Sequence, residues 1–325
     1  MITYKLKNRD HEIDMPCLCF GTADFDDSSN KESYFARLDK YVECGGYFID
    51  TARVYCSFIE NGADVSENTI GEWMQKRGNR EKMIIATKGG HPPIGEMNVS
   101  RLSKADLDSD LAKSLECLKT DYVDIYFLHR DDQSIPVSEI MPILNEYVKD
   151  DKVHFLGASN WSVERIAEAN KFAEENGLEP FRISQINYSL AHTSSDMFED
   201  PTLVCMDLNQ YNWYRDNNFP VMAFSPQAKG FFMKIADGTS VKNLMEGRFV
   251  STANLARLAR VKQYCKETGL SPAVVTLAYL NSHYIPVISV FTAGNLKHIE
   301  EDMTAQDLKF DNKTVAYLEN MGGIL

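Results

Sequence analysis

The sequence predicts an α/β protein, a (β/α)8 TIM barrel, from three observations. Eight short apolar runs with the length of buried β-strands alternate with stretches whose apolar residues recur at helical spacing. Polar residues able to do chemistry directly follow several of these runs, and the carboxyl ends of parallel strands meet on one face of a barrel. The chain has 325 residues, a length that such a barrel commonly reaches as one domain.

The chain begins with a predicted β-hairpin. Its strands, Tyr4 to Leu6 and Glu12 to Met15, flank the turn residues Asn8, Arg9 and Asp10. Eight barrel strands then follow, near residues 16–20, 46–49, 83–87, 123–128, 154–158, 182–186, 220–224 and 285–291.

The helices between the strands have recognisable ends. Ser103 and Ser162 each precede an apolar helical pattern with an acidic residue close behind, which is typical of an N-cap. Ser271 precedes Pro272 at a first helical position, where the missing N–H costs nothing. The preceding helix, 254–268, ends before Gly269, a favourable residue after a helix.

Two long loops interrupt the alternation, 193–201 after the sixth strand and 230–250 after the seventh. Long loops at the carboxyl face of a barrel are where binding sites are built. No repeat, low-complexity tract or linker divides the chain, so the sequence predicts one domain over 1–325.

Composition limits the partners and the location. The net charge of -13 argues against nucleic acid and anionic membranes as partners. We find no signal peptide and no apolar run of about 18 residues that would span a membrane. The seven cysteines are scattered, and Cys17-Leu18-Cys19 is not a zinc spacing, so we expect reduced thiols, a cytoplasmic protein and no metal.

Four residues just past predicted strands form a candidate catalytic set: Asp50, Tyr55, Lys88 and His129. A Lys88 cation favours the tyrosinate and is expected to lower the pKa of Tyr55. Asp50 would hold Lys88 charged and oriented. His129 would direct a carbonyl oxygen toward the Tyr55 hydroxyl, so that the set works as a tuned proton donor.

This order and strand-end context resemble the aldo-keto reductase family, whose catalytic tetrad is an Asp, Tyr, Lys and His. The resemblance covers essentially the whole chain. It implies reduction of an aldehyde or ketone to an alcohol by direct hydride transfer from NAD(P)H, with Tyr55 as proton donor. It also implies that the hairpin plugs the amino-terminal end of the barrel.

The resemblance further implies a set of cofactor contacts. Gly21 and Thr22 correspond to residues beside the nicotinamide ribose. Ser159, Asn160 and Gln185 correspond to the residues that bind the carboxamide, which offers both a donor and an acceptor. Phe224 stands where the family usually places an aromatic ring against the nicotinamide. The remaining predicted cofactor contacts are Asp50, Ser225, Gln227, Gly230, Gly294, Lys297 and Asp302.

The loop after the eighth strand departs from the family pattern. Relatives commonly carry an Arg or Lys there to hold the 2′-phosphate of NADPH, but the corresponding residue is Gly294. Lys297 and His298 remain as substitutes, and a helix beginning near Asn295 offers N–H groups to an anion. Carboxylates at 300–302, where Asp302 replaces an Asn, would instead repel a phosphate. The resemblance favours NADP(H), with NAD(H) or dual use as the alternative.

Predicted substrate contacts are Asp24, Phe25, His91, Arg130 and Trp161, which all follow strands that end near the chemistry. Most are polar, which favours a polar or sugar-like carbonyl. Arg130 and Asp131 have the alternative of pairing with each other. The indole ring of Trp161 is apolar and has one N–H donor. Trp161 is therefore predicted either to stack on a substrate or to lie at the edge of the core.

Other functions are compatible with parts of the sequence. A nicotinamide-binding regulatory protein that senses redox state is the main alternative. A glycoside hydrolase would need two carboxylates, such as Asp24 and Asp131, and would leave the tetrad unused. No Gly-x-Gly-x-x-Gly follows a strand, which argues against a Rossmann dehydrogenase. We expect a small-molecule substrate and a monomer or weak homo-oligomer.

Overall fold

The computed structural model describes residues 1–236 and 247–319 and contains a closed barrel of eight parallel strands in the order β10-β3-β4-β5-β6-β7-β8-β9. The predicted (β/α)8 barrel is therefore confirmed, and no predicted strand boundary differs by more than two residues. The barrel strands are β3 (Leu18–Gly21), β4 (Phe48–Asp50), β5 (Ile84–Gly89), β6 (Val123–Leu128), β7 (Val153–Ser159), β8 (Phe181–Asn187), β9 (Val221–Phe224) and β10 (Val287–Phe291).

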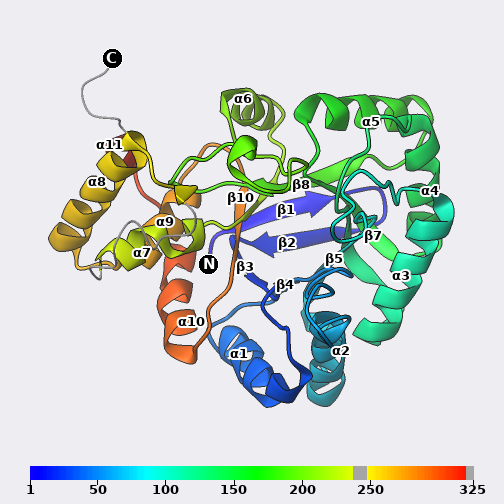
Figure 1. Ribbon diagram of the computed structural model, residues 1–325, viewed down its shortest axis with the longest axis horizontal. Helices are drawn as coiled ribbons and strands as arrows, with labels where there is room; N and C mark the ends of the chain where they lie inside the picture. Colours follow the sequence, from blue (N-terminus) through cyan, green and yellow to red (C-terminus); the bar gives the residue numbers. More distant parts are fainter. Residues whose placement is uncertain (237–246, 320–325) are drawn as a thin grey trace.

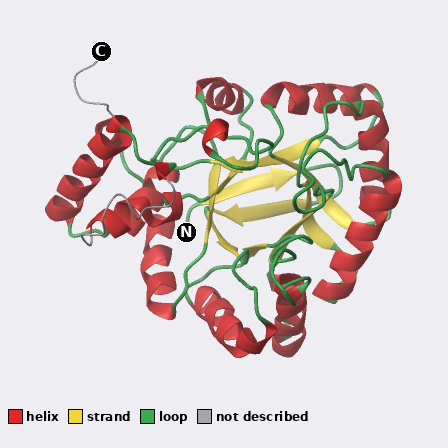
Figure 2. Ribbon diagram, in the orientation of Figure 1, coloured by secondary structure: helices red, strands yellow, loops and turns green. Residues whose placement is uncertain are grey.

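Helices surround the barrel on its outside (Figure 2). The predicted caps are present: Ser103, Ser162 and Ser271 each accept a backbone N–H of the following turn, and Gly269 ends α8 in the left-handed conformation. The helices are α1 (Lys31–Glu43), α2 (Val65–Arg77), α3 (Lys104–Leu118), α4 (Val137–Lys149), α5 (Val163–Glu175), α6 (Leu208–Asp216), α7 (Phe231–Ala236), α8 (Thr252–Thr268), α9 (Pro272–Leu280), α10 (Leu296–Met303) and α11 (Asn312–Glu319).

The predicted hairpin is formed by the antiparallel strands β1 (Thr3–Lys7) and β2 (Glu12–Pro16). Figure 1 shows it lying across the centre of the barrel. Its inward-facing Leu6 and Met15 are buried against residues of the barrel interior, and its turn contacts the first residues of β7 through Asn8. The hairpin therefore closes the amino end of the barrel and leaves the carboxyl end for the site.

Apolar side chains fill the barrel interior, and they alternate along each strand as the strand geometry requires. Gly157 on β7 leaves room for the Phe127 ring on β6, since a Cβ atom at this position would lie 2.4 Å from that ring. The barrel is thus a packed core rather than a pore. The interior residues are Cys19, Phe48, Ile84, Ala86, Ile125, Phe127, Phe155, Ile183, Met222 and Ile288.

Of the two predicted long loops, 193–201 contains only a short 3-10 turn at Ser195–Met197. The second begins with helix α7, and its residues 237–246 lie outside the described part of the chain. All seven cysteines are free thiols. No helix among the described residues is long and apolar enough to cross a membrane.

Candidate active site

The site is the uppermost layer of the barrel interior. Because side chains alternate along a strand, the residue two positions beyond an inward-facing apolar residue also faces inward. At the carboxyl ends of seven strands this rule places residues that the sequence predicted as catalytic or cofactor-binding. They are Gly21, Asp50, Lys88, His129, Ser159, Gln185 and Phe224.

The Lys88 ammonium group is fully enclosed and has four oxygen acceptors. Its Nζ lies 2.7 and 2.9 Å from the two carboxylate oxygens of Asp50, 2.8 Å from the Thr51 carbonyl oxygen and 2.8 Å from the Tyr55 hydroxyl. Gln185 donates to the same carboxylate at 2.8 Å. The Tyr55 hydroxyl also donates to Asp50 at 3.1 Å. Asp50, Tyr55 and Lys88 are thus one hydrogen-bonded unit.

The predicted direction of the Tyr55 pKa is wrong for this unit. Burial of the hydroxyl and the nearby Asp50 carboxylate raise the pKa of Tyr55 well above its usual range, and they outweigh the opposing positive charge of Arg130. Burial also lowers the pKa of Lys88, while Asp50 opposes that shift. Tyr55 is therefore a neutral phenol at ordinary pH, which is the form a proton donor needs.

His129 follows β6 and packs at the edge of two other rings. Its ring centroid lies 6.1 Å from that of Tyr55 and 4.7 Å from that of His91. Burial lowers the pKa of His129 well below its usual range, and the neighbouring Arg130, His91 and Lys88 act in the same direction. Its Nδ1 has no partner in the described protein. A neutral imidazole here retains one N–H to donate to a carbonyl oxygen.

A cavity of about 850 Å³ opens over this layer. It has the size of a site for a cofactor together with a small substrate. Most of the predicted site residues line it. They are Gly21, Asp50, Tyr55, His129, Arg130, Ser159, Asn160, Gln185, Phe224, Ser225, Gln227, Gly230, Gly294 and Asp302.

Four of the five predicted substrate contacts do not line this cavity, and three of them have other roles. Phe25 is fully buried and stacks on Tyr34 with ring centroids 4.2 Å apart. Trp161 is also fully buried, against Phe181, because the chain turns at Asn160 and directs it into the core. Asp24 forms an ion pair with an arginine of α1 and accepts a hydrogen bond from the loop after β10. These three are packing or loop-tethering residues in this structure.

Three further predicted site residues, Thr22, Lys297 and His91, do not line the cavity. Thr22 is buried below the cavity and donates to the backbone oxygen of Asp50 at 3.0 Å. Lys297 is exposed on α10 and does not line the cavity, whereas its neighbour His298 does. His91 does not line the cavity, and its ring packs against the edge of the His129 ring. Thr22 and His91 thus support residues that line the cavity.

Arg130 and Asp131 do not pair with each other. Arg130 donates to Asp200 at 2.9 Å and to Thr202 at 2.8 Å, so the loop after β8 holds it in place. Asp131 lies 3.4 Å from the Arg165 guanidinium on α5. Only Arg130 of the two lines the cavity. The sequence could not supply these partners, because they come from elements far along the chain.

The amide residues of the site are only partly satisfied by one another. Asn160 donates to the Ser159 hydroxyl at 3.1 Å and accepts from the backbone N–H of Val204 at 3.2 Å. Gln185 points its amide nitrogen to Asp50 instead. Ser159, Asn160 and Gln185 therefore have donors and acceptors left for a ligand in the cavity. The hydrogen bonds within the protein meanwhile hold Ser159 and Asn160 in position.

The far end of the cavity lies between β9 and α10 and has mixed charge. Gln227 donates to Asp302 at 2.9 Å, and burial raises the pKa of Asp302 to about 7. Lys234 of α7 and His298 of α10 also line the cavity. Gly294 borders it with open space, since a Cβ atom there would meet nothing within 4 Å.

Sequence reasoning missed several residues that line the cavity. Met233 and Lys234 come from α7, and Pro272 and Ala273 come from the start of α9. The Ser271-Pro272 pair had signalled a helix start but not a wall of the site.

Comparison with known proteins agrees with this geometry. The model of the Aldo/keto reductase family matches residues 17–322. The chain belongs to this family. This aldo/keto reductase is 26% identical over 315 residues to YrpG of Bacillus subtilis, an uncharacterized oxidoreductase, with 94% of the chain and 91% of YrpG covered. It is 38% identical over 165 residues to an aryl-alcohol dehydrogenase of Pestalotiopsis microspora, over 49% of the chain and 41% of that protein.

A solved structure shares the fold of this aldo/keto reductase. The crystal structure of an aldo/keto reductase from Klebsiella pneumoniae, in complex with NADP and acetate, matches with a TM-score of 0.71 and 22% identity. The match covers 94% of this chain and 90% of that one.

The pKa of His129 can be measured directly. Because burial lowers it, the neutral imidazole persists below the usual pKa of about 6.5, and we expect its NMR signals to stay constant from about pH 8 down to about pH 5. A His129→Asn variant assigns the signals by their loss. A titration midpoint near the usual value would contradict the burial of this ring.

Proposed function

We propose that this aldo/keto reductase reduces an aldehyde or ketone to an alcohol with NAD(P)H, and that Tyr55 is the proton donor. The observation that carries the proposal is the Tyr55 hydroxyl, which borders the cavity and lies 2.8 Å from the buried Lys88 ammonium. The Tyr55 phenol is neutral before the reaction, and the Lys88 ammonium lies beside the oxygen that loses the proton.

The lining of the cavity fits a nicotinamide cofactor. Ser159, Asn160 and Gln185 present hydroxyl and amide groups at neighbouring strand ends, which suits a carboxamide with one donor and one acceptor group. Phe224 adds a flat aromatic surface on the same wall. When bound, the reduced nicotinamide supplies a hydride to the carbonyl carbon.

The residues of the chain then act on the carbonyl oxygen. His129 donates its N–H to that oxygen and orients it toward Tyr55. Tyr55 transfers its proton to the oxygen as negative charge develops there. The Lys88 ammonium stabilises the phenolate that remains, and Asp50 keeps the ammonium in position.

We propose NADP(H) as the preferred cofactor, with NAD(H) also accepted. Lys234 and His298 line the cavity and offer groups that can pair with a 2′-phosphate, and the raised pKa of Asp302, about 7, reduces the negative charge opposing the phosphate. The solved Klebsiella relative is described as a complex with NADP. The absence of an arginine at Gly294 and the carboxylate of Glu301 favour some use of NAD(H).

For the substrate we propose a polar carbonyl compound, with sugar-like compounds as the first class to test. Arg130 lines the cavity next to His129 and offers hydrogen bonds to polar groups. Aromatic aldehydes are the second class, because the predicted polar contacts Asp24 and His91 do not line the cavity and one relative is named an aryl-alcohol dehydrogenase. We further propose a cytoplasmic monomer or weak homo-oligomer that binds no nucleic acid.

The Tyr55→Phe variant tests the proton donor. Removal of the hydroxyl should lower kcat by about 10²- to 10⁴-fold, because general acid catalysis contributes this much. The Kd of NADPH, measured by fluorescence, should stay within about twofold, because Phe keeps the ring. Sugar-like and aromatic aldehydes serve as the substrate panel.

Two results would sink this assignment. The first is a Tyr55→Phe enzyme with unchanged turnover. The second is a wild-type protein that binds NADPH or NADH but turns over no carbonyl compound in the panel, which would favour the redox-sensing regulatory function.

The Gly294→Arg variant tests the cofactor end of the cavity. The new side chain has open space, and its guanidinium can pair with a phosphate, so the ratio of kcat/KM for NADPH over NADH should rise about tenfold. Gly294→Gln is the matched control, since it adds a long side chain without charge. An equal change for both cofactors would place the 2′-phosphate elsewhere.

A further inference from the structure

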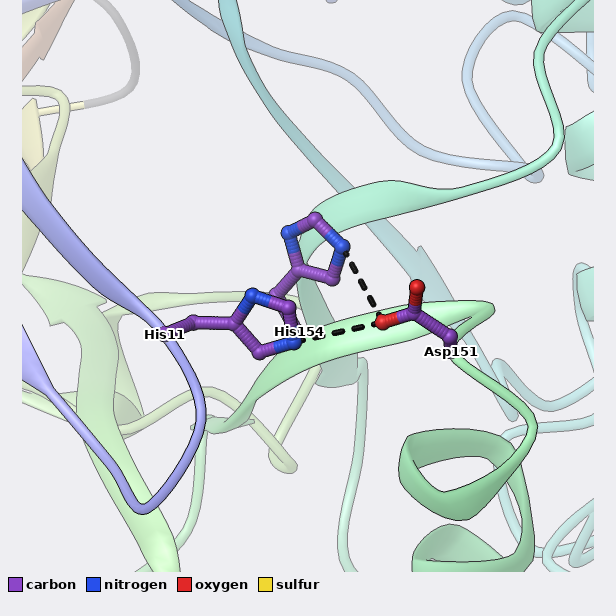
Figure 3. Close-up of side chains that lie close together, drawn as sticks. All are labelled: His11, Asp151 and His154. Carbon is purple, nitrogen blue, oxygen red and sulfur yellow. Dashed lines mark ion pairs between the residues drawn. The ribbon is translucent and has the colours of Figure 1, made fainter.

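Two histidines and an aspartate gather at the amino end of the barrel, opposite the site described above. His11 belongs to the turn of the hairpin, Asp151 precedes β7, and His154 is the second residue of that strand. In Figure 3 both imidazole rings turn toward one oxygen of the Asp151 carboxylate. Among the described residues this is the one group of three or more such side chains whose ligand atoms could hold a metal ion.

Two of the distances between the ligand atoms suit a tetrahedral metal ion. The Nε2 atoms of His11 and His154 lie 3.2 and 3.5 Å from the same Asp151 oxygen. Two ligands bound tetrahedrally at zinc distances of about 2.0–2.1 Å are about 3.3 Å apart. All three ligand atoms lie within 4.8 Å of one another. The rings of His11 and His154 stack with their centroids 3.9 Å apart, so the His11 ring has to turn out of this stack for both nitrogen lone pairs to point at one ion.

The Asn8 side chain helps to hold the two histidines in place, in addition to the Asp151 carboxylate. Asn8 accepts the backbone N–H groups of Asp10 and His11 at 3.0 and 2.7 Å, which shapes the hairpin turn. Its amide nitrogen donates to the backbone oxygen of His154 at 2.7 Å. One side chain thus fixes the distance between the hairpin turn and the start of β7.

The surroundings of His154 are typical of a metal ligand. Its other ring nitrogen, Nδ1, faces the buried carboxylate of Asp124 at 3.9 Å, and metal-binding histidines commonly have a carboxylate on that side. Asp124 is itself held by Arg80 at 2.9 Å. The ring also stacks on Tyr122, with centroids 4.5 Å apart. The orientation of His154 is therefore set before any ion binds.

We propose that His11, Asp151 and His154 bind one Zn²⁺ ion, with water as the fourth ligand. Two imidazoles with a carboxylate form a donor set that suits zinc, whereas calcium and magnesium prefer oxygen ligands alone. The Asp151 side chain is 73% exposed, which leaves access for the ion and for water. A bound ion would join the hairpin to β7 and stabilise the closure of the barrel's amino end.

Zinc binding by the full-length protein tests the proposal. We expect calorimetry on chelator-treated protein to give one Zn²⁺ per chain. Asp151→Asn should weaken binding by about tenfold or more, since even residues behind metal ligands have effects of this size. Asp150→Asn is the matched control, because it removes the adjacent exposed carboxylate, which pairs with Lys152, and should change the Kd by less than about twofold.

Two further readouts separate this site from chance binding. Zinc should raise the Tm of wild type and Asp150→Asn but not of Asp151→Asn or His11→Asn, because the ion links the hairpin to the barrel. Co²⁺ bound to the wild type should show the intense visible absorption of a tetrahedral complex. No binding at about 100 µM Zn²⁺, or equal affinity of Asp151→Asn and wild type, would overturn the proposal.

Discussion

A lysine ammonium group with no access to water must be neutralised and hydrogen-bonded by the protein itself, and Lys88 is such a group. Its acceptors come from Asp50, Thr51 and Tyr55, so β4, the turn after it and β5 are fixed relative to one another. Gln185 extends the network across the barrel to β8. The cavity floor and the position of the Tyr55 hydroxyl therefore follow from one buried ion pair.

Much of the fold and of the site could be predicted because both follow from strand geometry. Short apolar runs gave all eight strands, and residues such as Asp50 and His129 lie two positions beyond an inward-facing apolar residue. The alternation that packs the interior thus also presents the polar layer above it. Phe25 and Trp161 could not be placed in this way, because they follow turns whose backbone conformation the strand pattern does not specify.

Other features depend on groups that are distant in the sequence. The partners of Arg130 come from the loop after β8. The raised pKa of Tyr55 reflects burial and the Asp50 carboxylate, which outweigh the opposing charge of Arg130. The histidine and aspartate cluster at the amino end could not be predicted either, because its residues come from a hairpin turn and from the start of β7, which are distant in the sequence. The hairpin thus closes the amino end of the barrel, and the cavity with the candidate site lies at the carboxyl end.

The most direct test of the buried Asp50–Lys88 pair is a measurement of the free energy of unfolding. It compares Asp50→Asn, Lys88→Met and the double variant with the wild type. Asp50→Asn leaves an unpaired ammonium and should cost about 3–5 kcal/mol, whereas the double variant should be more stable than Asp50→Asn alone. Urea denaturation of the three variants and the wild type gives these values. Strictly additive losses would contradict the account, because they would mean that Asp50 and Lys88 do not stabilise each other.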